Sequence, residues 1–228
     1  IDTSREHIIN GKKIRGVLTG FPMLDYYMEG MLPGDLIILS GQTGVGKTLT
    51  AQAFALNMLK AGREVMFFSL EMLPSELVQR FIAIDTNVPM QKYAGMFRKS
   101  SLTDMDKTRV DATISRLRHY PLYFYTGDDK LDFRLLEVVS TTAVRKYNAQ
   151  IIFIDHLHYF ARGDARTRSV EIGDLVRDIK MLARRLNVPI VLISHLRKIG
   201  DYATEPTIDD LRDTSMSGQD ADVVLLLQ

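Results

Sequence analysis

Short apolar runs alternate with stretches of helical periodicity along most of the chain. Six runs are rich in β-branched and aromatic residues and have the length of buried strands. They are Leu36–Leu39, Glu64–Leu70, Leu122–Tyr125, Ile151–Asp155, Ile190–Ile193 and Val223–Gln228. Strands of this kind, alternating with helices, form parallel sheets that helices cover on both faces. The pattern therefore predicts an α/β fold around a mostly parallel sheet.

The stretches between these runs carry apolar residues at helical spacing. Helices are predicted over Leu49–Lys60, from Pro74 onward, from Thr103 to Pro121, over Leu131–Tyr147 and over Ser169–Leu186. Thr103 and Asp106 have the spacing of a capping box, with Asp in the place usually held by Glu or Gln. Gly62 and Asn148 are predicted to end helices in left-handed backbone conformations.

Apolar stripes on these helices predict which faces are buried. In the last helix six residues share one face: Ile172, Leu175, Val176, Ile179, Leu182 and Leu186. In the helix that Pro74 opens, the predicted buried side consists of Leu77, Val78, Phe81 and Ile82. A shorter stripe between Gly16 and Gly30 is predicted to pack in the core through Phe21, Leu24, Tyr27 and Met28.

The first of the six runs leads into a phosphate-binding loop. Its sequence, Gly41-Gln42-Thr43-Gly44-Val45-Gly46-Lys47-Thr48, is a full match to G-x-x-x-x-G-K-[ST], with a predicted strand before it and a predicted helix after it. Glycines let backbone N–H groups turn toward a phosphate, and the helix N-terminus adds partial positive charge. In this arrangement Lys47 reaches the β- and γ-phosphates and the Thr48 hydroxyl binds Mg²⁺. The loop predicts a nucleotide site.

Polar residues at the ends of other strands belong to the same edge of the predicted sheet, where ligands bind in α/β folds. Asp155 follows four apolar residues, as does the second Mg²⁺-associated carboxylate of phosphate-loop NTPases. Glu71 is a candidate base for the attacking water, and His195 a candidate donor to the γ-phosphate. The alternatives are ordinary ones: a helix N-cap or solvated strand end for Asp155, and structural roles for Glu71 and His195.

Composition limits the partners. With 29 basic against 28 acidic residues the formal net charge is +1, so nucleic-acid binding must come from local patches. The candidates are Arg162, Arg166 and Arg168 in one polar loop and Arg197 and Lys198 after the fifth strand; the alternative is a solvated charged loop. The absence of cysteine excludes disulfides, thiolate zinc sites and a Cys nucleophile. No apolar run is long enough to cross a bilayer.

Several motifs in this order resemble the motor domain of DnaB-type replicative helicases, a group that includes phage primase–helicases and the mitochondrial helicase Twinkle. They are Thr19-Gly20-Phe21 with Leu24-Asp25, the phosphate loop, Phe68-Ser69-Leu70-Glu71-Met72, Ile154-Asp155-His156-Leu157, Ile193-Ser194-His195-Leu196, Asp210-Leu211-Arg212 and Gln219-Asp220-Ala221-Asp222-Val223-Val224. The resemblance extends from Gly16 to Leu227, with residues 1–15 expected to be the tail of a linker.

The resemblance implies a RecA-like P-loop NTPase core that works in a homo-hexameric ring. Such a ring hydrolyses ATP or another NTP with Mg²⁺, translocates on single-stranded DNA and unwinds the duplex, with primase as a further candidate partner. By position, Lys47, Glu71 and His195 match the phosphate-loop lysine, the catalytic glutamate and the γ-phosphate sensor, and Thr48 and Asp155 match the metal-associated pair. The basic loops, 161–169 and 198–206, match the family's DNA-contacting loops. Arg177 and Lys180 match a basic pair whose role stays open.

The resemblance also sets further expectations and leaves alternatives. The family's arginine finger falls beyond Gln228 and its linking helix before Ile1, so both ends are expected to be cuts in a longer protein. An intracellular location is expected, in a bacterial or phage-infected cytoplasm or in a mitochondrion. A RecA- or RadA-like recombination ATPase shares the fold but forms filaments. A non-hydrolysing nucleotide-binding or clamp module is a third reading, against which Glu71 beside an intact phosphate loop argues.

Overall fold

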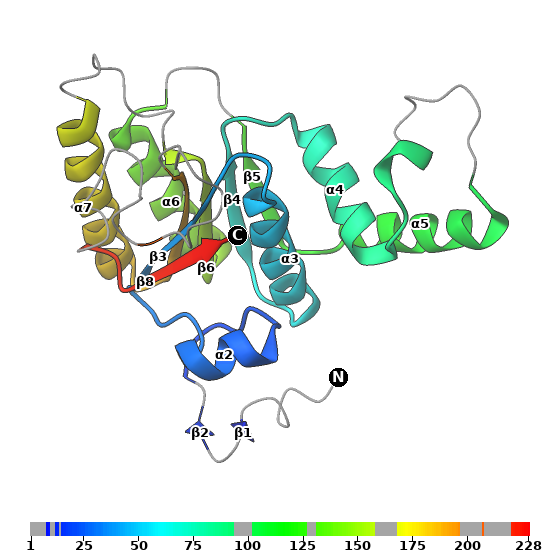
Figure 1. The fold of residues 1–228 in the computed structure, drawn as a ribbon, viewed down its shortest axis with the longest axis horizontal. Helices are drawn as coiled ribbons and strands as arrows, with labels where there is room; N and C mark the ends of the chain where they lie inside the picture. Colours follow the sequence, from blue (N-terminus) through cyan, green and yellow to red (C-terminus); the bar gives the residue numbers. More distant parts are fainter. Residues whose placement is uncertain are drawn as a thin grey trace.

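A six-stranded parallel sheet forms the centre of the molecule (Figure 1). The computed structural model describes residues 8–9, 12–13, 15–93, 102–126, 131–157, 168–196, 207 and 220–228. The strands lie in the order β5-β4-β6-β7-β3-β8, and every neighbouring pair is parallel. Their bounds are β3 Leu36–Gly41, β4 Val65–Ser69, β5 Leu122–Tyr125, β6 Ile151–Asp155, β7 Ile190–His195 and β8 Val223–Leu227. The predicted α/β class and all six predicted strands are confirmed.

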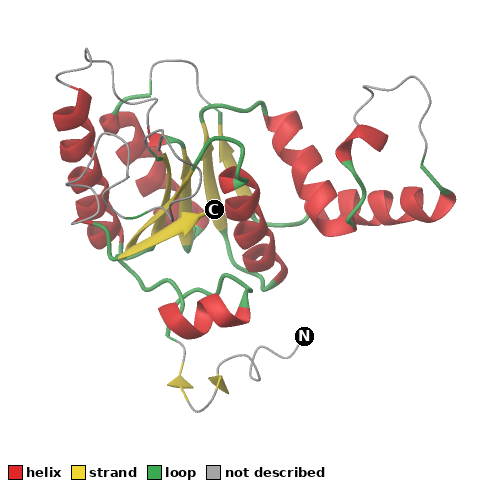
Figure 2. Ribbon diagram, viewed as in Figure 1, coloured by secondary structure: helices red, strands yellow, loops and turns green. Residues whose placement is uncertain are grey.

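Helices cover both faces of this sheet, as Figure 2 shows. One face packs against α6 (Phe133–Tyr147) and α7 (Arg168–Leu186), through residues such as Leu136 and Ile179. The other packs against α3 (Lys47–Lys60) and α4 (Pro74–Thr86), through residues such as Phe54. Side chains alternate between the two faces along each strand. In β6, Ile152 and Ile154 therefore pack on the side of α6 and α7, and Ile151 and Phe153 pack on the side of α3 and α4.

The remaining elements lie outside the sheet. The helix α5 (Asp104–Leu117) packs on α4 and extends away from the sheet, with the 3₁₀ turn η1 (Met90–Lys92) preceding it in the chain. Below the sheet in the view of Figure 1 lie α2 (Pro22–Met28) and two short antiparallel strands, β1 (Ile8–Ile9) and β2 (Lys12–Lys13).

Helix ends follow their sequence signals closely. Thr103 and Asp106 exchange both hydrogen bonds of a capping box at the start of α5. Asn148 ends α6 in the left-handed conformation at φ 56°, and Gly62 follows α3 at φ 75°. The α3 helix begins at Lys47, two residues before the predicted start, because the phosphate loop turns directly into it.

Two predicted apolar faces are partly wrong. In α2, Phe21 and Tyr27 are 45% and 74% exposed, and the residue buried there is Asp25. Its carboxylate accepts hydrogen bonds from the Thr19 N–H and hydroxyl and from the Gly20 N–H, so a polar cap stabilises this turn instead of an apolar stripe. In α4, Val78 is 37% exposed although Leu77, Phe81 and Ile82 are buried, because it lies one position round the helix from the stripe.

The structure assigns a structural role to Lys180, which the sequence left open. From α7 its ammonium donates to the Gly34 carbonyl at 2.8 Å and forms an ion pair with Asp222. Asp222 also accepts a hydrogen bond from the Leu36 N–H at 2.7 Å. Lys180 therefore joins the segments that lead into β3 and β8 to α7, at the opposite end of the strands from the phosphate loop. Arg177 forms ion pairs with Asp174 and Asp220 on the same side.

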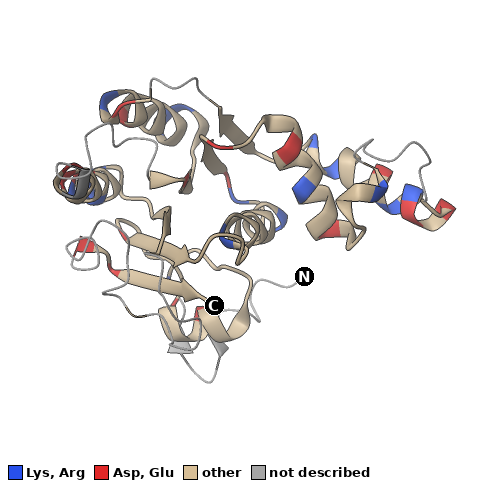
Figure 3. Cartoon of the chain, turned by 45° about the horizontal axis from the view of Figure 1, so that its top comes forward, with Lys and Arg blue, Asp and Glu red and all other residues tan. Residues whose placement is uncertain are grey.

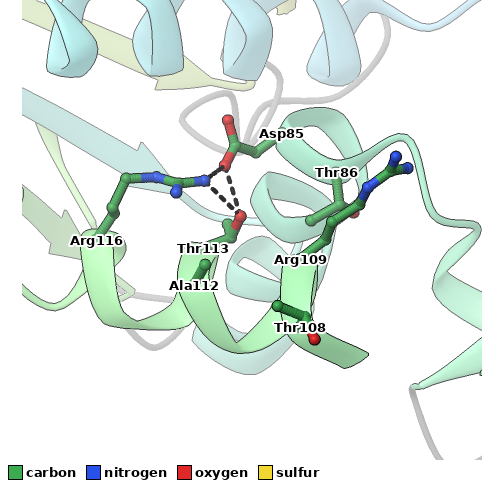
Figure 4. Close-up of a pocket in the computed structure, with 7 residues that line it drawn as sticks. All are labelled: Asp85, Thr86, Thr108, Arg109, Ala112, Thr113 and Arg116. Atoms are coloured by element: carbon green, nitrogen blue, oxygen red, sulfur yellow. Dashed lines mark hydrogen bonds and ion pairs between the residues drawn. The ribbon is translucent and has the colours of Figure 1, made fainter. Parts of the chain in front are cut away.

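The extension formed by α4 and α5 carries charges of both signs, interspersed along its length (Figure 3). One of them, Asp85, is nearly buried and joins three helices. It contacts the Lys60 ammonium at 2.6 Å. It also contacts the Arg116 guanidinium at 2.5 Å and the Thr113 hydroxyl at 2.6 Å (Figure 4). Burial alone would raise the pKa of Asp85, but the hydrogen bonds from Lys60, Thr113 and Arg116 outweigh it and lower that pKa to about 2.

We predict that Asp85→Asn lowers the free energy of unfolding by about 1–3 kcal/mol, because charge-assisted hydrogen bonds between α3, α4 and α5 are lost. Since the pKa of Asp85 is lowered in the folded state, its stabilising effect is complete above about pH 4 and disappears as the pH falls toward 2. Urea unfolding of both proteins between pH 2 and 7 measures this.

The matched control is Asp104→Asn, which removes an exposed ion pair with Lys107 on the same extension. Exposed pairs contribute roughly 0–1 kcal/mol, so this variant is expected to resemble the unsubstituted protein. An Asp85→Asn variant no less stable than the Asp104→Asn variant would contradict the prediction.

Candidate active site

Four neighbouring strands bring the predicted site residues to one edge of the sheet. In sheet order, β4 leads to Glu71, β6 ends at Asp155, β7 ends at His195 and β3 ends at Gly41. The registers align their ends, with Ser69 opposite Asp155 and Gly41 opposite His195. Because all the strands are parallel, residues separated by more than 150 positions in the chain lie together.

The phosphate loop has the open shape that its glycines predict. Gly44 and Gly46 have φ values of +86° and +101°, a backbone conformation that residues with a side chain rarely adopt. An added Cβ at either position would meet no atom beyond its chain neighbours within 4 Å. Gly41 is different, because a Cβ there would lie 2.7 Å from the Val45 side chain and 2.8 Å from the Leu227 carbonyl oxygen. The loop is therefore tightly packed where it leaves β3 and open around Gly44 and Gly46.

Lys47 folds back over this loop. Its ammonium donates hydrogen bonds to the Gly41 carbonyl at 2.9 Å and the Gln42 carbonyl at 2.8 Å, and the residue is buried. Burial lowers the pKa of Lys47, while the negative charges of Asp155 and Glu71 oppose that shift. Among the described residues, the hydrogen bonds of this buried cation go to neutral carbonyls, so it is well placed to exchange one of them for a phosphate oxygen.

Asp155 is linked directly to the loop. The Thr48 hydroxyl donates a hydrogen bond to Asp155 Oδ2 at 2.8 Å, across 107 positions of sequence. Asp155 is only 2% exposed, which excludes the alternative of a solvated strand end. Burial raises the pKa of Asp155 to about 6; the hydrogen bond from Thr48 opposes this shift, and the negative charge of Glu71 adds to it. A hydroxyl and a buried carboxylate side by side are the oxygen ligands that Mg²⁺ prefers.

Glu71 lies in a turn that is tied to the neighbouring strand. The Leu70 N–H donates to the Asp155 carbonyl at 2.8 Å, and the Ser69 hydroxyl closes the turn on the Met72 carbonyl at 3.0 Å. The Glu71 side chain remains 52% exposed at the mouth of the site. An accessible carboxylate beside a phosphate loop is in a position to accept a proton from water.

Two histidines complete the cluster, His195 and His156, and the sequence assigned no role to His156. His195 ends β7, and its ring lies edge-on to that of His156, with the ring centroids 4.7 Å apart. His156 Nδ1 lies 3.3 Å from Glu71 Oε2. Burial lowers the pKa of His156, although Glu71 opposes the shift. The signal for His156 was its position directly after the strand-end aspartate.

Ligand atoms of Glu71, Asp155 and His156 all lie within 4.8 Å of one another, so this corner gathers groups that bind cations. The structure thus brings together Lys47, Thr48, Glu71, Asp155 and His195. The predicted DNA-contacting residues are a separate matter: Arg162, Arg166, Arg197 and Lys198 lie outside the described residues, and Arg168 is placed only as the first residue of α7. Gln219 also lies outside them.

Comparison with known proteins identifies the family. The sequence pattern that defines the DnaB-like helicase C terminal domain matches residues 16–228. The chain belongs to the DnaB-like helicase C-terminal domain family. The match begins where the expected linker tail ends, and it spans the phosphate loop and all four strand ends of the site.

Known relatives of this DnaB-like domain are replicative helicases. The chain is 33% identical over 218 residues to the replicative DNA helicase DnaB of Leifsonia xyli subsp. xyli, a match that covers 93% of this chain and 46% of that protein. It is 31% identical over 222 residues to the replicative DNA helicase DnaC of Bacillus subtilis, covering 94% and 47%. The chain thus spans about half the length of these curated relatives.

Solved structures support the same fold. An ATPase domain of known structure superimposes with a TM-score of 0.84 at 24% identity, covering 93% of this chain and 76% of that one. A DnaB-like replicative helicase, solved in a study of its interactions with primase, also gives 0.84 at 24% identity, covering 98% and 55%. The predicted RecA-like P-loop core is confirmed at the level of the fold. Across the parts of the DnaB-like domain that the structure places, every helix is too short or too polar to span a bilayer.

Because Asp155 is buried, its ionised form is expected to lower the free energy of unfolding. In nucleotide-free protein with EDTA, Asp155→Asn is expected to raise the free energy of unfolding at pH 7 by up to about 3 kcal/mol, because a buried charge is removed. The pKa of Asp155 is raised in the folded state, so the wild-type protein loses this stability as the pH rises from about 4 to 6. The gain in the variant should therefore shrink toward zero as the pH falls to about 4.

Denaturant unfolding across that pH range is the measurement. Asp178→Asn, which changes an exposed carboxylate on α7, serves as the control and should show neither the gain nor its pH dependence. An Asp155→Asn variant that is less stable than wild type at pH 7 would show that the ionised carboxylate stabilises the empty site.

Proposed function

We propose that this domain is the nucleotide-hydrolysing motor of a replicative DNA helicase, which acts as a homo-hexameric ring that translocates on single-stranded DNA and separates the duplex. The observation that carries the proposal is the contact between the Thr48 hydroxyl and buried Asp155, with Glu71 beside them. This arrangement joins a phosphate loop, a pair of Mg²⁺ ligands and a candidate base at one edge of the sheet. The named activities of the relatives in this family support the same conclusion.

The residues present fit an Mg²⁺–nucleotide complex. Gly44 and Gly46 keep the loop free of side chains where phosphate oxygens would approach, and the start of α3 would direct backbone N–H groups toward them. Lys47 would exchange its contact with the Gln42 carbonyl for the β- and γ-phosphates, and Thr48 and Asp155 would hold Mg²⁺. When bound, the metal ion would neutralise charge on the phosphate oxygens.

Hydrolysis needs a group that positions the attacking water and positive charge that stabilises the phosphoryl oxygens in the transition state. Glu71 would orient the attacking water and accept its proton. Lys47 would stabilise negative charge that develops on the phosphoryl oxygens, which a buried ammonium does more effectively than a solvated one. His195, which ends β7 beside Gly41, would donate a hydrogen bond to the γ-phosphate and respond to its loss.

Two other readings are less well supported. A RecA- or RadA-like recombination ATPase has the same sheet, but the family match and the named relatives favour a helicase. A non-hydrolysing nucleotide-binding or clamp module does not require a carboxylate at the mouth of the site, where Glu71 lies. Primase is a candidate partner, because one structural neighbour was solved in a study of that interaction.

Strand separation on a forked DNA duplex tests the proposal. Full-length protein with Glu71→Gln is expected to bind ATP with unchanged affinity but to lose hydrolysis by roughly 10²–10⁴-fold, because the base is removed while the shape stays. Unwinding should fall in the same proportion. Glu76→Gln, an exposed glutamate in the first turn of α4, is the control and should keep both activities.

If the Glu71→Gln protein unwinds DNA at the wild-type rate, Glu71 is not the base for hydrolysis. ATP hydrolysis without unwinding by the wild-type protein, together with filament formation on DNA, would instead favour the recombination ATPase.

A second test concerns the basic loops, which we propose line the central channel of the ring and bind single-stranded DNA through its phosphates. Arg166→Ala with Arg168→Ala in full-length protein should weaken binding to single-stranded DNA. It should also make the salt dependence shallower by a log–log slope of about 0.7 for each lost phosphate contact. Sequence preference should change little, because backbone contacts carry no base information.

The control for this pair replaces Arg118 and Arg184, two exposed arginines that lie at the opposite end of the strands. Binding measured across a salt series should separate the two double variants while hexamer assembly stays intact. Equal affinities and equal slopes for all three proteins would mean that the loop 161–169 is a solvated surface.

A further inference from the structure

We propose that His156 is a positioning residue for hydrolysis, which holds the Glu71 carboxylate in place through its Nδ1 atom. The inference rests on the proposed function, because it assumes that Glu71 is the base. It adds a residue to which neither the motif pattern nor the family match assigns a role.

The contact between His156 and Glu71 carries the proposal. His156 Nδ1 and Glu71 Oε2 are 3.3 Å apart, close enough for a hydrogen bond, but the two groups are not oriented as one in this structure. Contacts of this kind in nucleotide-free sites often shorten only when substrate binds. A neutral imidazole that donates from Nδ1 would orient one carboxylate oxygen and leave the other for water.

Glu71 needs such a partner because its own surroundings restrain it little. Its backbone is fixed by the Leu70 and Ser69 hydrogen bonds, but its side chain is 52% exposed. A long, exposed side chain samples several rotamers, and a catalytic group is effective only when it is held close to the reacting atoms. Asp155, by contrast, is buried and bound to Thr48.

His156 itself is well fixed. Its side chain is only 12% exposed, and it lies between the buried residues Asp155 and Leu157. The ring of His195 packs edge-on against it, with an angle of 77° between the ring planes. The partner of Glu71 is thus packed among other side chains while Glu71 is exposed, which is the arrangement that a positioning residue requires.

Two substitutions distinguish the effect of the His156 Nδ1 atom from the effect of the ring as a packing group. His156→Phe keeps a ring against His195 but removes Nδ1, and it should lower kcat for ATP about 10–100-fold, with KM nearly unchanged. His156→Asn places an amide donor at about the position of Nδ1 and removes the ring, and it should keep kcat within about threefold of wild type. Both are made in full-length protein, and binding of a non-hydrolysable ATP analogue checks that each variant folds.

The same substitutions are then made in the Glu71→Gln background. If His156 acts through Glu71, His156→Phe should cause no further loss of single-turnover rate there, because no base remains to be positioned. An equal loss in both backgrounds would overturn the proposal and leave His156 a structural residue. An Asn variant as impaired as the Phe variant would overturn it too, since the effect would then follow the ring.

The outcomes also distinguish this inference from the proposed function. Glu71→Gln impaired with His156→Phe fully active would overturn the role of His156 alone. Glu71→Gln fully active would overturn both. If the Phe variant does not bind the analogue, His156→Leu replaces it, because it also lacks Nδ1 but fills less space.

Discussion

The hydrogen bond from the Thr48 hydroxyl to Asp155 is the contact on which the site depends. It joins the end of the phosphate loop to the end of β6, although β7 lies between β6 and β3 in the sheet. Such a contact is possible only because every strand runs in the same direction, so that all their carboxyl ends meet at one edge. The helices packed on both faces of the sheet maintain that alignment, as do the contacts of Lys180 with Gly34 and Asp222 at the far end of the strands.

The two buried charges of the site are unfavourable by themselves. A buried carboxylate whose pKa is raised to about 6 lies near a buried ammonium whose pKa is lowered, and each faces neutral hydrogen-bond partners. Magnesium and phosphate would supply the missing opposite charges, so ligand binding should stabilise the fold as well as start the reaction. The Asp85 cluster shows the opposite arrangement, because there the carboxylate already has its cations and its pKa is lowered.

The sequence predicted the sheet and the place of the site well, for physical reasons. The strands β3, β6 and β7 are buried on both faces, so their sequences are continuous apolar runs. A full phosphate-loop pattern, in turn, allows few backbone conformations. The sequence also predicted which strand ends carry polar residues. It could not predict the contact of His156 with Glu71, since that depends on how the chain leaves β6. It misjudged Phe21 and Tyr27, because spacing alone does not show that Asp25 is the residue that turns inward.

ATP hydrolysis by full-length protein carrying Lys47→Ala tests the central claim most directly, with Lys107→Ala, an exposed lysine of α5, as the control. If phosphate is bound by the loop from Gly41 to Thr48, the Lys47 variant should lose at least about 10²-fold in rate, while the Lys107 variant keeps the wild-type rate. Both should unfold at the temperature of the wild-type protein or above it. A Lys47→Ala protein that hydrolyses ATP at the wild-type rate would contradict the account.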